Sequence, residues 1–211
     1  MELLYTPRRY LQSALQMNAA YLMQIAPAST LTACAGFQDG DEFRWLSRIA
    51  YRTRELQNAH PDRGFGTKER ENWEQAPAWQ GIRELMEKVL ATYDWGENFV
   101  AGNLVAKIAV DETLRQLGAT GRQFGDPLVS LMADNQLRDS DRSRRWSTAV
   151  VEFCSTHEGN NAVISGWIEK WMPLARNAIE TYCAALPESE GAASKAIANV
   201  EAFHRSLGVS N

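Results

Sequence analysis

The sequence has 211 residues, of which 45% are hydrophobic and 23% charged, and its formal net charge is −4, as in an ordinary globular domain with a substantial core. An acidic chain argues against a nucleic-acid partner, and no apolar run approaches the roughly 18 residues that a membrane span requires. The first residues lack the pattern of a signal peptide, and three widely separated cysteines favour a reducing, cytoplasmic location.

The first two elements are predicted to be amphipathic helices. In residues 7–25, apolar side chains recur at spacings of three, four and seven after a Thr-Pro start, which is the pattern of a helix with one buried face. Residues 30–58 predict a longer helix, in which Glu42 and Trp45 share a stripe with aliphatic side chains. Because positions i and i+3 point the same way, Glu42 is expected to face the interior.

The remainder of the chain is also predicted to be helical. Helical patterns occupy residues 79–93, 97–117, 127–157, 161–186 and 194–207. Gly118 and Gly121 are predicted to end the helix at 97–117, since glycine commonly follows a helix C-terminus. No stretch shows β alternation, so the sequence predicts an all-α, ferritin-like bundle of four long helices with peripheral C-terminal helices. We expect one helical domain over residues 1–186, followed by a linker and a short helix over residues 187–211.

Two helices carry the outline of a di-iron site without its nitrogen ligands. Carboxylate-bridged di-iron proteins place Glu-x-x-His on two helices of a bundle and single glutamates on two others. In this sequence Glu42 is followed at i+3 by Trp45, and Glu112 is followed at i+3 by Arg115. Both histidine positions therefore hold residues that cannot ligate iron in this way.

Two interpretations of the inward carboxylates remain open. A site for Mg, Ca or Mn could use carboxylates alone, and the candidates are Asp41, Glu42, Glu84, Glu87, Asp111 and Glu112. Alternatively, Glu112 forms an ion pair with Arg115, and Glu42 pairs with Arg48, Arg52 or a neighbour's arginine. We favour the ion pairs and expect Trp45 to fill the volume that a ligand cluster would occupy.

Catalytic motifs are also missing from the sequence. It contains no nucleophile elbow, no Cys–His pair and no phosphate-binding glycine loop. The three histidines, His60, His157 and His204, fall in a turn, at a helix end and in the tail. We therefore predict that this chain provides neither catalytic residues nor metal ligands.

An interface is predicted from arginine and tryptophan. Large aromatic residues and arginine are enriched in the anchors of protein–protein contacts, and the helix at 30–58 alternates arginines with apolar groups. The candidate interface residues are Arg44, Arg48, Arg52, Trp73 and Trp79.

Several tryptophan-rich stretches resemble one known family over most of the chain. They are residues 8–11, 15–17, 23–30, 44–46, 50–53, 55–56, 79–88, 93–97 and 166–171. They resemble the β subunit of the hydroxylase of bacterial multicomponent di-iron monooxygenases, in the toluene monooxygenase branch. Chains of that family carry a further N-terminal segment before the position matching Leu3, which is absent here and would be expected to wrap the α subunit.

The resemblance implies a non-catalytic role. In that family the α subunit holds the di-iron centre and the substrate pocket, and the β subunit keeps the fold without the ligands, so that Trp45 and Arg115 mark lost ligand positions. The implied partners are α and γ subunits in a doubled hetero-oligomer, served by an effector protein, a Rieske ferredoxin and an NADH-dependent reductase. The implied activity is hydroxylation of aromatic hydrocarbons or epoxidation of alkenes with O2. The alternative is a stand-alone all-α binding protein, or a carboxylate-only metal protein, that has diverged from this family.

Overall fold

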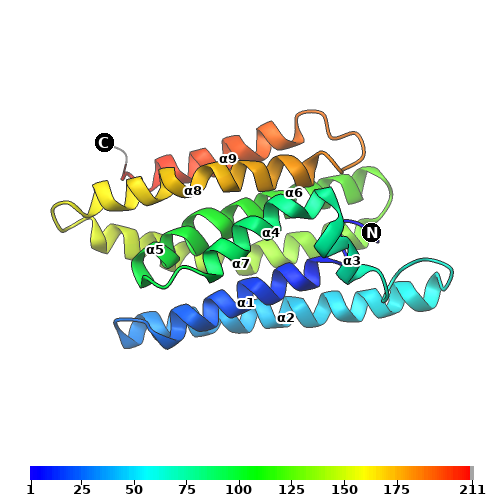
Figure 1. Ribbon diagram of the computed structural model, residues 1–211, viewed down its shortest axis with the longest axis horizontal. Coiled ribbons are helices and arrows are strands. Elements are labelled where there is room, and N and C mark those ends of the chain that lie inside the picture. The colour runs from blue at the N-terminus through cyan, green and yellow to red at the C-terminus, as the bar shows by residue number, and fades with distance from the viewer. Residues whose placement is uncertain (210–211) are drawn as a thin grey trace.

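The computed structural model describes residues 1–209, and these residues form an elongated stack of helices (Figure 1). The elements are α1 (Arg8–Gln24), α2 (Ser29–Ala59), α3 (Glu69–Gln75), α4 (Pro77–Leu90), α5 (Trp95–Phe99), the π-helix η1 (Val100–Ala106), α6 (Lys107–Gln123), α7 (Pro127–Cys154), α8 (Asn160–Cys183) and α9 (Ala192–Ser206). The prediction of an all-α fold is confirmed. None of these helices combines the length and apolar character needed to cross a bilayer.

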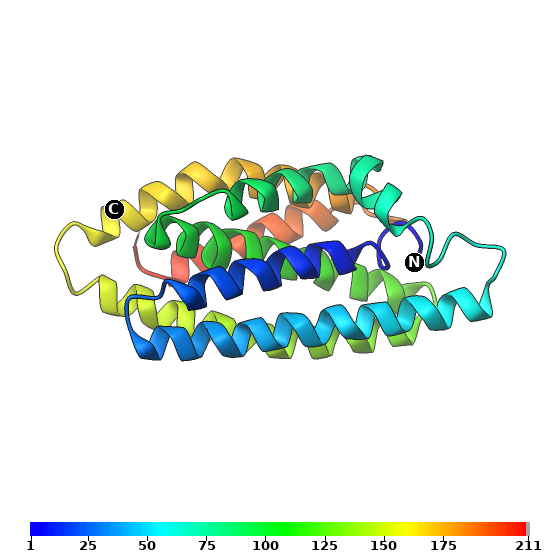
Figure 2. The same cartoon turned by 60° about the horizontal axis from the view of Figure 1, so that its bottom comes forward.

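Four helices build the central bundle. The hairpin of α1 and α2 packs beside the hairpin of α6 and α7, and Figure 2 shows α2 and α7 running together along one long side. The short α4 pairs with α8 on the other side, and both contact η1. The bundle therefore consists of α1, α2, α6 and α7, and α4 lies outside it although it precedes α6 and α7 in the sequence.

Local sequence signals explain where the bundle helices begin. Asp126 accepts a hydrogen bond from the backbone N–H of Val129 at 3.2 Å, and Pro127 occupies the first turn of α7. In this Asp-Pro start, the carboxylate satisfies a free N–H group and proline needs none. Asp94 caps α5 in the same way through the N–H of Glu97.

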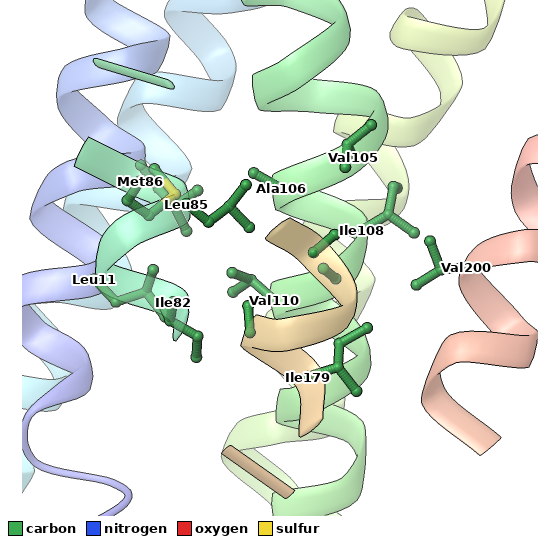
Figure 3. Close-up of a cluster of buried hydrophobic side chains, with 14 of the residues drawn as sticks. Leu11, Ile82, Leu85, Met86, Val105, Ala106, Ile108, Val110, Ile179 and Val200 are labelled. Atoms are coloured by element: carbon green, nitrogen blue, oxygen red, sulfur yellow. The ribbon is translucent and has the colours of Figure 1, made fainter. Parts of the chain in front are cut away.

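The hydrophobic core surrounds η1 and α6. Every residue from 98 to 114 is buried, so this segment has no solvent-facing side. Figure 3 shows Leu85 and Met86 of α4, Ile179 of α8 and Val200 of α9 around the side chains of η1 and α6. The C-terminal α9 packs on α6 and α8 through this contact.

The segment predicted as one helix at 97–117 differs from the structure in two ways. It consists of α5, η1 and α6, and α6 continues to Gln123. The prediction that Gly118 and Gly121 end the helix is wrong, because both lie inside α6 where it meets α7. A Cβ atom on Gly118 would lie 2.8 Å from the Cβ of Ala133, and one on Gly121 would lie 3.1 Å from the Cβ of Val129. These glycines permit close packing of the two helices.

Candidate functional site

A cluster of polar side chains lies at the centre of the bundle, and we call it the central cluster. It consists of Gln12 from α1, Glu42 from α2, Lys107 and Asp111 from α6, and Ser140 from α7. All five residues are at most 3% exposed. Because buried charges are costly unless they are paired and hydrogen-bonded, the contacts within this cluster decide what it can do.

The ammonium group of Lys107 occupies the middle of the central cluster. Its Nζ lies 2.8 Å from Oδ1 of Asp111, 2.6 Å from Oγ of Ser140 and 3.4 Å from Oε1 of Glu42. Ser140 donates its own hydroxyl proton to Asp111 at 2.9 Å, and Gln12 donates to the other oxygen of Glu42. Of the three donors of the ammonium, two make hydrogen bonds, to Asp111 and Ser140, and Glu42 is held as an ion pair.

The ion pairs continue outwards through Glu112. Arg144 of α7 lies 3.1 Å from Oδ2 of Asp111 and 3.6 Å from Glu112, and Arg115 lies 3.2 Å from Glu112. Asn199 of α9 donates to Glu112 at 2.8 Å. The cations of Lys107, Arg115 and Arg144 thus match the carboxylates of Glu42, Asp111 and Glu112 in number.

Burial and charge shift the pKa values in opposite directions within the cluster. Burial raises the pKa of Glu42 to about 6, although the nearby Lys107 ammonium opposes this shift. Burial disfavours the charge on Lys107, but the carboxylates of Asp111 and Glu42 outweigh that effect and raise its pKa. Burial also disfavours the Asp111 carboxylate, and Lys107 and Arg144 reverse the effect, so its pKa is lowered. Lys107 and Asp111 therefore form a charged pair.

The structure confirms one of the two predicted ion pairs and contradicts the other. The pair between Glu112 and Arg115 is confirmed at 3.2 Å. The expected pairing of Glu42 with Arg48 or Arg52 is wrong, because Glu42 faces into the bundle and meets Lys107 instead. The two arginines line the outer surface of α2. A carboxylate that points into the bundle cannot reach them there.

Trp45 is buried beside the cluster. Its Nε1 donates to Oδ2 of Asp139 at 2.7 Å, and the guanidinium of Arg48 lies 4.9 Å from the centre of its ring. The space between Glu42 and Asp111 is taken by the Lys107 ammonium. The group found between these carboxylates is thus the Lys107 cation, which the prediction did not include, and not the Trp45 indole.

The central cluster does not fit a carboxylate–histidine metal centre. A covalently attached ammonium stands between its carboxylates, and the three histidines of the chain lie elsewhere. Among residues 1–209, no group of three or more His, Cys, Asp and Glu side chains is arranged to hold a metal ion. The other candidate carboxylates are paired as well: Asp41 with Arg44 and Arg142, Glu84 with Lys88, and Glu87 with Arg83.

The histidines contribute to helix ends and packing. His60 and His157 are exposed near the C-termini of α2 and α7. His204 of α9 donates its Nε2 proton to the carbonyl of Leu104 in η1 at 2.7 Å. Burial lowers the pKa of His204, although the Leu104 hydrogen bond opposes the shift, so its neutral form binds the π-helix.

Sequence reasoning missed Lys107, although a signal for it exists. Lys107 is the only charged residue between positions 99 and 110, and Asp111 follows it at i+4. A charge inside such an apolar run is expected to be buried, and its i+4 carboxylate is a natural partner. This pattern distinguishes Lys107 from the solvent-facing lysines of the chain.

The predicted interface residues have different exposures. Arg44 and Arg48 are exposed, and Arg52 and Trp73 are partly buried. The prediction is wrong for Trp79, which is 0% exposed and donates its Nε1 proton to the carbonyl of Leu3 at 2.7 Å. An indole that packs completely inside its own chain cannot anchor a partner.

Comparisons with known proteins identify relatives of the chain. The family described as Methane/Phenol/Alkene Hydroxylase matches residues 1–158. The toluene-4-monooxygenase system, hydroxylase component subunit beta, from Ectopseudomonas mendocina is 49% identical over 183 residues, which cover 86% of this chain and 56% of that protein. The propane 2-monooxygenase, hydroxylase component small subunit, from Gordonia sp. (strain TY-5) is 26% identical and is covered to 43%. The chain thus spans about half the length of the curated relatives it matches.

Solved structures share the fold. A structure of toluene 4-monooxygenase with toluene bound in its resting active site matches with a TM-score of 0.86 and 49% identity, over 88% of this chain and 62% of that chain. Phenol hydroxylase from Pseudomonas sp. OX1 matches with a TM-score of 0.78 over 98% of this chain and 63% of that chain. At 24% identity, the second match bears on the fold alone.

Proposed function

The chain belongs to the methane, phenol and alkene hydroxylase family, and on that premise we propose that it is the non-catalytic β subunit of a multicomponent monooxygenase of the toluene type. In this role it braces a larger α subunit that holds the di-iron centre. The relative named as a hydroxylase subunit beta, at 49% identity, supports this assignment.

The position of Lys107 is the observation that carries the non-catalytic role. Its ammonium forms ion pairs with Glu42 and Asp111 at the centre of the four-helix bundle, where a di-iron protein of this architecture would need its carboxylates free for metal. The i+3 positions after Glu42 and Glu112 hold Trp45 and Arg115. This chain therefore provides a folded scaffold, and the oxygen chemistry belongs to another subunit.

The proposal extends to the complete enzyme. The chain assembles with α and γ subunits in a doubled hetero-oligomer, which receives NADH-derived electrons through a reductase and a Rieske ferredoxin and is modulated by an effector protein. The enzyme uses O2 to hydroxylate aromatic hydrocarbons or to epoxidise alkenes. A cytoplasmic location is supported by the three free thiols of Cys34, Cys154 and Cys183, since reduced cysteines are typical of that compartment.

Co-expression with the α subunit tests this function. The chain is expected to co-elute with α during size-exclusion chromatography, and light scattering should give a mass above that of either chain alone. A monomeric chain in the presence of α would contradict the proposal. Metal analysis of the isolated chain tests the absence of a centre of its own: stoichiometric iron in this chain would show that the central cluster is rearranged to bind metal.

A further inference from the structure

Arg8 is a buried charge that lacks a balancing group among residues 1–209. It is the first residue of α1 and is 0% exposed, and its Nε, Nη1 and Nη2 have no hydrogen-bond partner in the described part of the chain. A guanidinium keeps its charge in a protein and carries five N–H donors. A buried charge of this kind is costly unless a negative group neutralises it and satisfies its donors.

The charge of Arg8 acts on two buried tyrosines, which cannot neutralise it. Burial raises the pKa of Tyr182 and of Tyr5, and the Arg8 guanidinium opposes both shifts without making a hydrogen bond to either hydroxyl. Tyr182 donates to the carbonyl of Leu4 at 2.9 Å, and Tyr5 donates to Sδ of Met132 at 3.2 Å. Both phenols are therefore neutral groups whose protons are directed elsewhere.

The buried carboxylates are committed to other groups. Within residues 1–209 the buried acidic residues are Asp41, Glu42, Glu69, Asp111 and Glu112. Four of them form ion pairs with lysine or other arginines, and Glu69 accepts a hydrogen bond from the backbone N–H of Gly66 at 2.7 Å. A negative charge beside Arg8 therefore has to come from outside the described residues.

The place of Arg8 at the start of α1 adds to the positive potential. The N-terminal end of a helix carries about half a positive charge, and Pro7 provides no side-chain cap for α1. Because helical side chains point back towards the N-terminus, the guanidinium of a first-turn residue lies near this positive end. The side chain and the helix thus favour the same kind of ligand, which is an anion.

The N-terminal segment restricts the size of that ligand. The carbonyl of Leu3 accepts a hydrogen bond from Nε1 of Trp79 at 2.7 Å, and the carbonyl of Leu4 accepts one from Tyr182, so these residues are held against α4 and α8. Figure 1 shows the N-terminal end beside α3 and the start of α1. Since Arg8 has no exposed surface, its ligand is small and is enclosed by the fold.

We propose that Arg8 is the binding site for one small monovalent anion, either a halide or a carboxylate of the size of formate. One guanidinium carries one positive charge, so one monovalent ion balances it, and complete burial excludes larger anions. A halide accepts from two N–H groups, and a small carboxylate accepts two parallel hydrogen bonds from the guanidinium fork. The inference goes beyond the proposed function and does not depend on it.

Urea unfolding of the full chain in different sodium salts tests the proposal. Chloride, bromide or formate is mixed with gluconate at constant ionic strength, and gluconate alone is the control because it is too large for an enclosed site. In wild type, the folding equilibrium constant should rise about tenfold for each tenfold increase in the small anion above its dissociation constant. Arg8→Met should lose this dependence, and Arg70→Met, which removes an exposed arginine, should retain it.

Crystals of the full chain locate the ion independently of any variant. They are grown in bromide, or in formate if formate alone stabilises the chain. We expect an anomalous bromide peak, or planar density for formate, within hydrogen-bond distance of the Arg8 guanidinium. An ordered water molecule in that place would overturn the proposal.

The remaining outcomes are equally decisive. Stabilisation by chloride and bromide identifies a halide, and stabilisation by formate alone identifies a carboxylate; both support the site. Equal stability of the wild type in all four salts would overturn it, as would an anion effect that persists in Arg8→Met. Bromide density without stabilisation in solution would show an adventitious ion only. If Arg8→Met does not fold, the salt dependence of the wild type and the density at Arg8 together decide.

Discussion

Replacing Lys107 with methionine tests the electrostatics of the bundle directly. Methionine keeps the length of the side chain and removes the ammonium, which leaves the carboxylates of Asp111 and Glu42 without their shared cation. Removing one partner of a buried ion pair costs about 3–5 kcal/mol, because the remaining charge stays buried and uncompensated. Asp111 retains Arg144 and Ser140, so we expect a loss near the lower end, about 3 kcal/mol at pH 8.

The pH dependence of this loss identifies its cause. Burial raises the pKa of Glu42 to about 6 even with Lys107 present, and removing the cation raises it further. At pH 5 Glu42 is then largely protonated and neutral, so Lys107→Met should cost less at pH 5 than at pH 8. A second variant, Lys107→Met with Glu42→Gln, should recover much of the loss at pH 8.

Urea unfolding followed by tryptophan fluorescence provides the measurement, since the chain contains seven tryptophans. The free energy of unfolding is compared for wild type, Lys107→Met and the double variant at both pH values. A loss below about 1 kcal/mol at pH 8, on a scale where a broken buried pair costs several, would refute the reasoning. A loss of equal size at both pH values would show that the uncompensated charge of Glu42 is not its cause.

Three further predictions concern single positions. Trp45→Ala should lower the free energy of unfolding by about 3–5 kcal/mol because the indole is buried. Trp45→Phe should lower it by about 1–3 kcal/mol through loss of the hydrogen bond to Asp139. A cost below about 1 kcal/mol for Trp45→Ala would mean that the indole is not part of the core. Gly118→Ala should cost about 1–3 kcal/mol by overpacking the α6–α7 contact, and Ala133→Gly in the same chain should restore stability; equal stability of all three proteins would contradict the close approach. The raised pKa of Glu42 means that the folded state binds more protons than the unfolded state between pH 4.5, its usual pKa, and about pH 6. The free energy of unfolding should therefore fall by about 2 kcal/mol as pH rises through that window. Glu42→Gln should flatten the plot of unfolding free energy against pH in this window, and an unchanged slope would assign the proton to another group.

The sequence predicted helices well where one face meets solvent. The helix expected at 30–58 is α2, Ser29–Ala59, because a single buried stripe defines its period and a Pro-Ala-Ser segment precedes it. The prediction of one helix at 97–117 was less accurate because residues 98–114 are all buried. A segment without a polar face shows no periodic alternation of polar and apolar residues from which its helical repeat could be identified. Within it, η1 also departs from the α-helical repeat, which shifts the register of the residues that follow.

The site was predicted only in part for a related reason. Helical spacing placed Glu42 and Glu112 inside the bundle and paired Glu112 with Arg115 on the same helix. The partner of Glu42 comes from α6, a helix far along the chain, and spacing within one helix carries no information about such a contact. The same limit explains Trp79, whose burial against the N-terminal residues depends on tertiary packing.

The lysine at the centre of the bundle has a consequence for how the fold responds to its surroundings. When a bound metal ion balances buried carboxylates, that ion can dissociate. The stability of the folded protein then depends on the concentration of the ion. The Lys107 ammonium is attached to the backbone beside Asp111 and Glu42, so its local concentration is constant and no chelator can withdraw it. The bundle thus carries a tethered counter-ion, which makes its internal charge balance independent of the metal supply of the cell.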